Sequence, residues 1–151
     1  GRPLDRATIA RPGRELWILH PQGELPPEDA RPETTQILLI DGSWKQASDL
    51  LRTLVGWGRT VRLPMSGESR FHLRTQQGDH QFSTIEALLF LLARFELTAA
   101  HDEIRRQFEL HVFAGLLARG KRADARNYLE TSPARDAFPE LIARLDPHRD
   151  A

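Results

Sequence analysis

The feature that most constrains the fold is a change of hydrophobic period in the first third of the chain. Residues 36–40 (QILLI) form a run that is continuously apolar after Gln36, which is typical of a central parallel strand covered on both faces. Residues 43–46 then give a Ser-x-x-Gln capping box, and leucines recur at helical spacing as far as Gly56. A further strand is expected at 60–63, before Pro64. This order predicts a βαβ unit with a right-handed crossover and parallel pairing of its two strands.

The rest of the sequence predicts a mixed α/β chain that becomes helical toward its end. Residues 15–19 have the composition of a short strand that His20-Pro21 ends, and 22–33 is a Pro- and acid-rich loop. A long loop is expected over 65–81, with a short strand at 71–74 within it. Helices are expected over 83–97, 102–119, 123–129 and from Ser132-Pro133 to Leu145.

Composition excludes several classes of site. The sequence has no cysteine, which excludes disulfides, thiolate nucleophiles and cysteine-ligated zinc, and its six histidines show no metal-ligand spacing. Its 21 lysines and arginines balance 21 aspartates and glutamates, so no overall charge points to a nucleic acid or a membrane. The longest apolar run, 87–93, is far shorter than the roughly 20 residues of a membrane span. We therefore expect a cytoplasmic protein without metal or membrane anchor, and interpret Gly1 as a cut end or an expression scar.

Asp41 is the first candidate functional residue. It lies where an apolar strand ends and a helix begins, the place where open α/β sheets bind their ligands. Its carboxylate can act as a base, bind a ribose or simply form an Asp-Gly turn. Ser43 and Gln46 are explained by capping, although the amides of such a helix start also bind anions. Trp44 belongs either to the core or to a surface that stacks on a base.

A basic stretch is the second candidate. Between residues 52 and 74 five arginines stand against Glu68 alone, a local balance of +4, and His72 adds conditional charge. Such a region suits a phosphate or a carboxylate, the alternative being a solvated arginine-rich face. A second capping box, Ser83-Thr84-Ile85-Glu86, opens a helix apolar enough to be central, so its N-terminus is expected to face a crevice.

Three ordered motifs together resemble those of the DTW-domain family, the tRNA-uridine aminocarboxypropyltransferases, and more distantly those of the ribosomal-RNA aminocarboxypropyltransferases. The family's D-x-T-W, followed by K/R-Q-A, is similar to Asp41-Gly42-Ser43-Trp44-Lys45-Gln46-Ala47. Its S-R-aromatic-x-L-R is similar to Ser69-Arg70-Phe71-His72-Leu73-Arg74, and its S-T-x-E-A to Ser83-Thr84-Ile85-Glu86-Ala87. The resemblance covers 37–92 best. Ser43 replaces the usual threonine and keeps its hydroxyl, and most of the family's N-terminal portion is expected to be missing.

The length of 151 residues predicts a single DTW-type domain over 1–151, with 98–151 as its helical C-terminal extension. The resemblance implies a SPOUT-like, mostly parallel α/β fold with a knotted C-terminal part. It further implies S-adenosylmethionine as donor and transfer of its 3-amino-3-carboxypropyl group to a uridine nitrogen of tRNA. The oligomeric state stays open, a homodimer being one alternative.

The same resemblance assigns roles to residues. Asp41 becomes the general base or the residue that positions the uridine. The donor is expected to contact Ser43, Trp44, Ser83, Thr84 and Glu86, and RNA phosphate or the donor carboxylate to contact Lys45, Arg70 and Arg74. Two alternatives remain: a non-catalytic or truncated module that binds RNA or the donor, and a SPOUT-like RNA methyltransferase.

Overall fold

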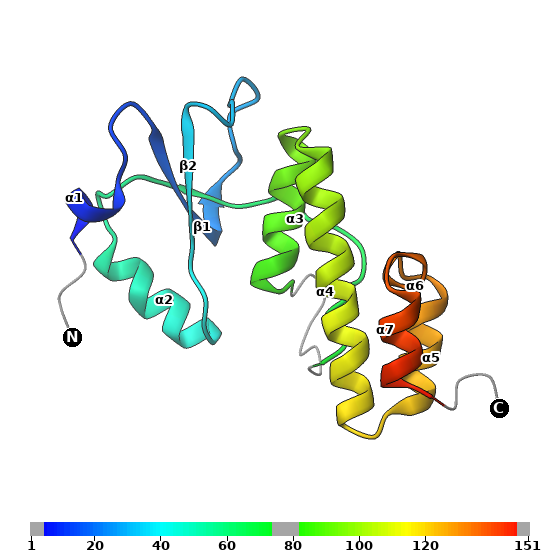
Figure 1. Cartoon of the computed structure of the whole chain (residues 1–151). Coiled ribbons are helices and arrows are strands. Elements are labelled where there is room, and N and C mark those ends of the chain that lie inside the picture. Colours follow the sequence, from blue (N-terminus) through cyan, green and yellow to red (C-terminus); the bar gives the residue numbers. More distant parts are fainter. Residues whose placement is uncertain (1–4, 74–81, 148–151) are drawn as a thin grey trace. The chain divides into compact units, whose positions relative to one another are not determined.

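The computed structural model describes residues 5–73 and 82–147 and shows a mixed α/β chain (Figure 1). Its contacts divide it into two compact units, Gly1–Met65 and Ser66–Ala151, which we describe one at a time. The first unit holds α1 (Arg6–Ile9), β1 (Glu15–Glu24), β2 (Thr35–Leu39), α2 (Trp44–Thr53) and β3 (Arg59–Val61). The second unit holds helices α3 to α7.

The first unit is built on three parallel strands in the order β2-β1-β3. Leu19 of β1 is in register with both Leu39 of β2 and Val61 of β3. Residues 16–18 of this central strand are only 0–4% exposed. The bulky apolar side chains of β1, Trp17 above all, therefore form the centre of this unit.

This arrangement corrects two sequence-based predictions. The run at 36–40 is not the central covered strand: β2 lies at one edge of the described sheet, and its residues 36–39 are half-buried. The strands that flank α2 are parallel but do not pair, because β1 lies between them. An apolar run indicates that a segment is buried but does not indicate which strand lies beside it. The central place goes to β1, which carries the larger side chains.

A third correction concerns the end of β1, which continues through Pro21 to Glu24. Both Leu19 and Glu24 face Val61, so the register is irregular between them. Proline lacks an N–H and is tolerated in a sheet at such an irregularity. A Cβ on Gly23 would lie 2.6 Å from backbone atoms of Val61, so only glycine allows this close approach.

A second close approach gives a testable prediction. A Cβ on Gly58 would overlap the carbonyl oxygen of Leu16 and lie 2.9 Å from its Cβ. We expect Gly58→Ala to lower the free energy of unfolding by about 1–3 kcal/mol, because the backbones of β1 and β3 would have to separate. Urea unfolding measures this. Gly56→Ala is the comparison: its Cβ meets nothing within 4 Å, so only the φ of +79° is strained, at about 1 kcal/mol. Equal midpoints for Gly58→Ala and wild type would contradict the close approach.

Helix α2 begins as predicted. The Ser43 hydroxyl accepts the N–H of Gln46, and the Gln46 side chain accepts the N–H of Ser43 at 2.8 Å. The four-residue helix α1 was not expected, because a single turn is too short to show periodicity. Asp5 caps it by accepting the N–H of Ala7.

The second unit is helical over most of its described length: α3 (Thr84–Arg94), α4 (Thr98–Ala118), α5 (Arg122–Glu130), α6 (Ala134–Ala137) and α7 (Pro139–Leu145). The single helix predicted from 133 to 145 is wrong. Phe138 is non-helical (φ −133°, ψ 49°), since a residue that precedes proline avoids the helical region. The strand predicted at 71–74 is also wrong where the structure describes it, because Phe71 is irregular and residues 72–73 form a turn. Arg74 lies outside the described residues.

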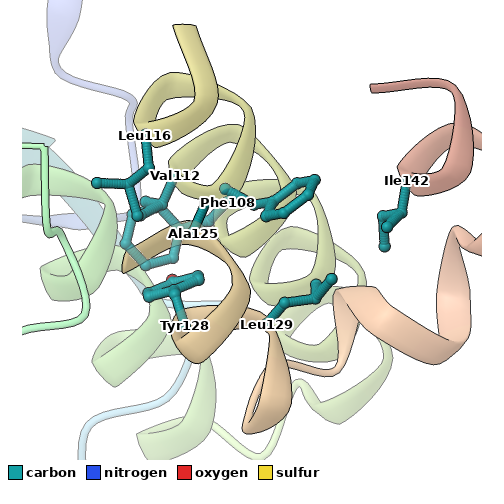
Figure 2. Packing of buried hydrophobic residues seen from close by; sticks show 8 residues of the cluster. Phe108, Val112, Leu116, Ala125, Tyr128, Leu129 and Ile142 are labelled. Carbon is teal, nitrogen blue, oxygen red and sulfur yellow. The ribbon is translucent and has the colours of Figure 1, made fainter. Parts of the chain in front are cut away.

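The core of the second unit is a cluster of buried side chains from α4, α5 and α7. Figure 2 shows residues of α4 and α5 pointing toward one another, with Ile142 of α7 beside them. The cluster consists of Phe108, Val112, Phe113, Leu116, Ala125, Tyr128, Leu129 and Ile142. Of the helices in the described ranges, none is long and apolar enough to cross a membrane.

Candidate functional site

The first group of candidate residues lies at the carboxyl ends of the parallel strands. Asp41 is exposed between the end of β2 and the start of α2, two residues beyond Leu39. Because the three strands are parallel, their carboxyl ends meet at one edge of the sheet, where α/β folds commonly bind ligands. An exposed carboxylate at this edge can accept a proton or pair with a cationic group.

The start of α2 is organised by its cap. Ser43 and Gln46 bond to each other's backbone, so both are used in holding the helix start. Gly42 has a φ of +146°, and a Cβ there would lie 3.1 Å from the Gln46 amide oxygen. Trp44 is the first residue of α2, and Lys45 after it is exposed. The cap and the glycine turn together fix the backbone that presents Asp41.

His20 also lies near this edge of the sheet. In the sequence, His20 was only one of six histidines without metal-ligand spacing. It follows Leu19, the last regularly paired residue of β1, and is only 6% exposed. Its Nδ1 accepts the N–H of Gln22 at 3.2 Å, so the neutral ring carries its proton on Nε2. That nitrogen is buried and has no hydrogen-bond partner among the described residues. A His-Pro pair directly after an apolar run was the signal available in the sequence.

His20 makes stability depend on pH. Burial lowers the pKa of His20, so the folded protein binds this proton less readily than the unfolded chain does. The contribution of neutral His20 to the free energy of unfolding is fully present above the usual histidine pKa, about 6.5, and is lost as the pH falls below it. We expect the free energy of unfolding to decrease between about pH 7.5 and 5.5, and to decrease less in His20→Gln. Urea denaturation across this range measures the difference.

The matched control is His111→Gln, which changes an exposed histidine of α4. The lowered pKa of Glu15 does not interfere. It results from hydrogen bonds donated by Trp17 and Arg59 and acts below the usual glutamate value of 4.5. Identical pH profiles for His20→Gln and wild type would contradict the assignment.

In the second unit, Glu86 joins two of the motifs recognised in the sequence. It is the N3 residue of α3, and its carboxylate accepts the N–H and hydroxyl of Ser83, both at 2.7 Å. The same carboxylate accepts the hydroxyl of Ser69 at 2.9 Å and the backbone N–H of Arg70 at 2.6 Å. Glu86 therefore does more than close a capping box: it holds the 69–70 segment against the start of α3.

The Arg70 side chain makes its contacts on two other helices. It donates to the Glu109 carboxylate at 2.9 Å and to the Thr131 hydroxyl at 3.0 Å, and its guanidinium lies 4.2 Å from the centre of the Tyr128 ring. Glu109 is 1% exposed and also accepts from Arg105 at 3.0 Å. Two arginines thus neutralise one buried carboxylate, as burial of a charge requires. Sequence reasoning missed Glu109, although an acidic residue on the apolar face of a helix was a visible signal.

The Arg70 segment borders a pocket of about 280 Å³ on the second unit. The pocket is lined by Arg70, His72, Leu116, Lys121, Asp124, Asn127 and Tyr128. Of the predicted site residues, the structure thus brings Arg70, Ser83 and Glu86 together. Thr84 is the first residue of α3 and is half-buried. Within the described ranges, no group of three histidine or carboxylate side chains is placed to hold a metal ion.

Comparison with known protein families gives a match that covers the three motifs found in the sequence. A family model described as the DTW domain matches residues 5–114, well over half of the chain. The chain belongs to the DTW-domain family. The matched part of this DTW domain extends beyond 37–92 in both directions and includes Asp41, Arg70, Glu86 and Glu109, whereas α5, α6 and α7 lie after it. Neither the curated proteins nor the solved structures gave a match.

Proposed function

We propose that this DTW domain transfers the 3-amino-3-carboxypropyl group of S-adenosylmethionine to a uridine nitrogen of tRNA. One observation carries the proposal: the residues that match the DTW family model include Asp41, an exposed carboxylate between a parallel strand and a capped helix. The resemblance of the three motifs supplies the reaction class. The proposal includes the SPOUT-like knotted arrangement and a cytoplasmic location, both of which remain predictions.

In the proposed reaction Asp41 takes the proton of the uracil ring nitrogen. The nitrogen uses the freed electron pair to bond to the donor carbon beside the sulfonium. The carbon–sulfur bond breaks, its electron pair stays on sulfur, and methylthioadenosine leaves as a neutral thioether. A positioned carboxylate contributes about 10²–10⁴-fold to such proton transfers, and orientation of the reacting carbon adds to this.

The remaining residues hold the reactants. The glycine turn and the capped start of α2 fix the backbone on either side of Asp41. Trp44 is assigned to the uridine or donor pocket, and Ser83, Thr84 and Glu86 to its donor side. The Glu86 carboxylate accepts the backbone N–H groups of Ser83 and Arg70, so its assigned role is to hold this backbone. Lys45 and Arg74 are assigned to RNA phosphate or the donor carboxylate. Arg70 shares this assignment, although Glu109 already binds part of its guanidinium.

The test uses unmodified bulk tRNA and S-adenosylmethionine with separate labels in its methyl group and its carboxylate. The proposal expects the carboxylate label in RNA and the methyl label in methylthioadenosine. Transfer of the methyl label alone would identify a methyltransferase instead. No transfer by folded protein that binds tRNA would identify a non-catalytic module.

A further inference from the structure

The pocket on the second unit has a chemistry that the proposed reaction at Asp41 does not use. It lies between residues 70–72, the end of α4 and one face of α5. Asp124, Asn127 and Tyr128 share that face, since they are spaced by three and four residues along α5, and Lys121 is the N-cap of this helix. Because the DTW match ends at 114, the pocket combines a family motif with a helix that lies outside the match.

The charges around the pocket favour an anion. Arg70 and Lys121 line it, and Arg105 stands behind Arg70 on the Glu109 carboxylate. Of the residues that line the pocket, Arg70 and Lys121 are cations and Asp124 is the one carboxylate, 3.9 Å from the Lys121 amine. The lining therefore carries one positive charge in excess, while beyond it Glu109 binds Arg70 and Arg105, and the Glu86 carboxylate accepts the backbone N–H of Arg70. S-adenosylmethionine carries a net positive charge, so this pocket suits RNA phosphate better than it suits the donor.

The side chains that form the wall of the pocket are also packed against one another. Tyr128 is 3% exposed, packs against the Arg70 guanidinium, and forms a T-shaped pair with the His72 ring, with 5.1 Å between the ring centres. Its hydroxyl and the Arg70 Nε are buried without a hydrogen-bond partner in the described ranges. The Arg70 Nε donates and the Tyr128 hydroxyl can donate, and burial raises the pKa of Tyr128, so the wall of the pocket carries no anionic tyrosine. A wall with cationic and donor groups suits a ligand rich in acceptor oxygens.

From these observations we infer that the pocket binds a backbone phosphate of the RNA substrate. Arg70, His72, Lys121 and Asn127 contact the phosphate or its ribose, and Tyr128 holds the first two in place. A pocket of about 280 Å³ has room for one phosphate with its sugar. This subsite rests on the proposed function, since it assumes an RNA substrate, and it assigns part of RNA binding to α5.

The experiment measures the dissociation constant of tRNA against salt concentration for wild type and Lys121→Ala. Loss of one phosphate contact is expected to weaken binding about three- to ten-fold and to reduce the salt slope by about one. Lys121→Glu is expected to weaken binding further. Arg135→Ala, which removes an exposed arginine of α6 in the same unit, is the matched control and is expected to change neither quantity. Thermal unfolding confirms that each variant is folded.

Several outcomes would overturn the inference. One is an equal salt slope in Lys121→Ala and wild type. Another is equal weakening by Lys121→Ala and Arg135→Ala, which would show a general charge effect. A third is Lys121-dependent binding of inorganic phosphate without any effect on tRNA, which would mean a small-anion site. Binding of S-adenosylmethionine is measured in parallel and is expected to be the same in Lys121→Ala and wild type. Failure of the subsite then appears in tRNA affinity, whereas failure of the proposed function appears in the transferred label.

Discussion

Asp41→Asn is expected to lower aminocarboxypropyl transfer by about 10²–10⁴-fold, the usual contribution of a general base. The amide has the shape of the carboxylate but cannot accept the uracil proton. Because Asp41 is exposed, the free energy of unfolding is expected to stay within about 0.5 kcal/mol of wild type. The measurement is single-turnover transfer of the carboxylate label from S-adenosylmethionine to tRNA.

Asp49→Asn provides the matched control, since it is the same substitution on an exposed residue of α2. Asp49 pairs only with exposed Arg52 among the contacts described, so its loss is expected to cost a few tenths of a kcal/mol and no activity. Full transfer activity in a folded Asp41→Asn variant would remove Asp41 from the mechanism. A decrease in tRNA affinity with an unchanged rate at saturation would make it a positioning residue instead.

Glu109→Leu is expected to destabilise the second unit by about 3 kcal/mol, the lower end of the range for breaking a buried ion pair. The substitution leaves Arg70 and Arg105 without their shared carboxylate. The loss is moderated because both arginine side chains are partly exposed and regain water. Glu109→Gln keeps the shape and one acceptor oxygen, and is expected to cost less than Glu109→Leu. Urea unfolding at neutral pH measures both variants.

Glu103→Gln on the same helix is the control for this series. Glu103 is exposed and pairs with Arg106, so its replacement is expected to cost less than about 1 kcal/mol. The destabilised Glu109 variants are also expected to bind tRNA more weakly, because Arg70 loses the partner that orients it. Wild-type stability in Glu109→Leu would show that the carboxylate does not hold the two arginines.

The contacts of Glu86 and Glu109 show how two motifs of the family meet in the structure. Glu86 binds the backbone of residues 69–70, and Glu109 binds the side chain of Arg70. One short segment is thereby held by α3 through its backbone and by α4 through its side chain. The motif serine, arginine and glutamate form one hydrogen-bonded unit.

The sequence alone determined the longer local elements of this protein, though not the one-turn helix α1 or the break between α6 and α7. Both capping boxes, at Ser43 and Ser83, form as predicted, and β2 and β3 lie within two residues of the segments predicted for them, whereas β1 begins as predicted but runs five residues longer. The reason is physical: a cap is a hydrogen bond between residues three apart, so its partners are fixed by the sequence itself. The DTW motifs belong to this category, since they too are read residue by residue.

Only the tertiary structure decided which of these elements meet. The strand order is β2-β1-β3: β1, with the fully buried Trp17, takes the central place, and the apolar run at 36–40 lies at the edge. The partner of Arg70 lies 39 residues away, and the pocket combines residues on both sides of α4. Such contacts depend on the burial and charge of many residues in the unit together, and the spacing of residues in the sequence does not show which of them meet.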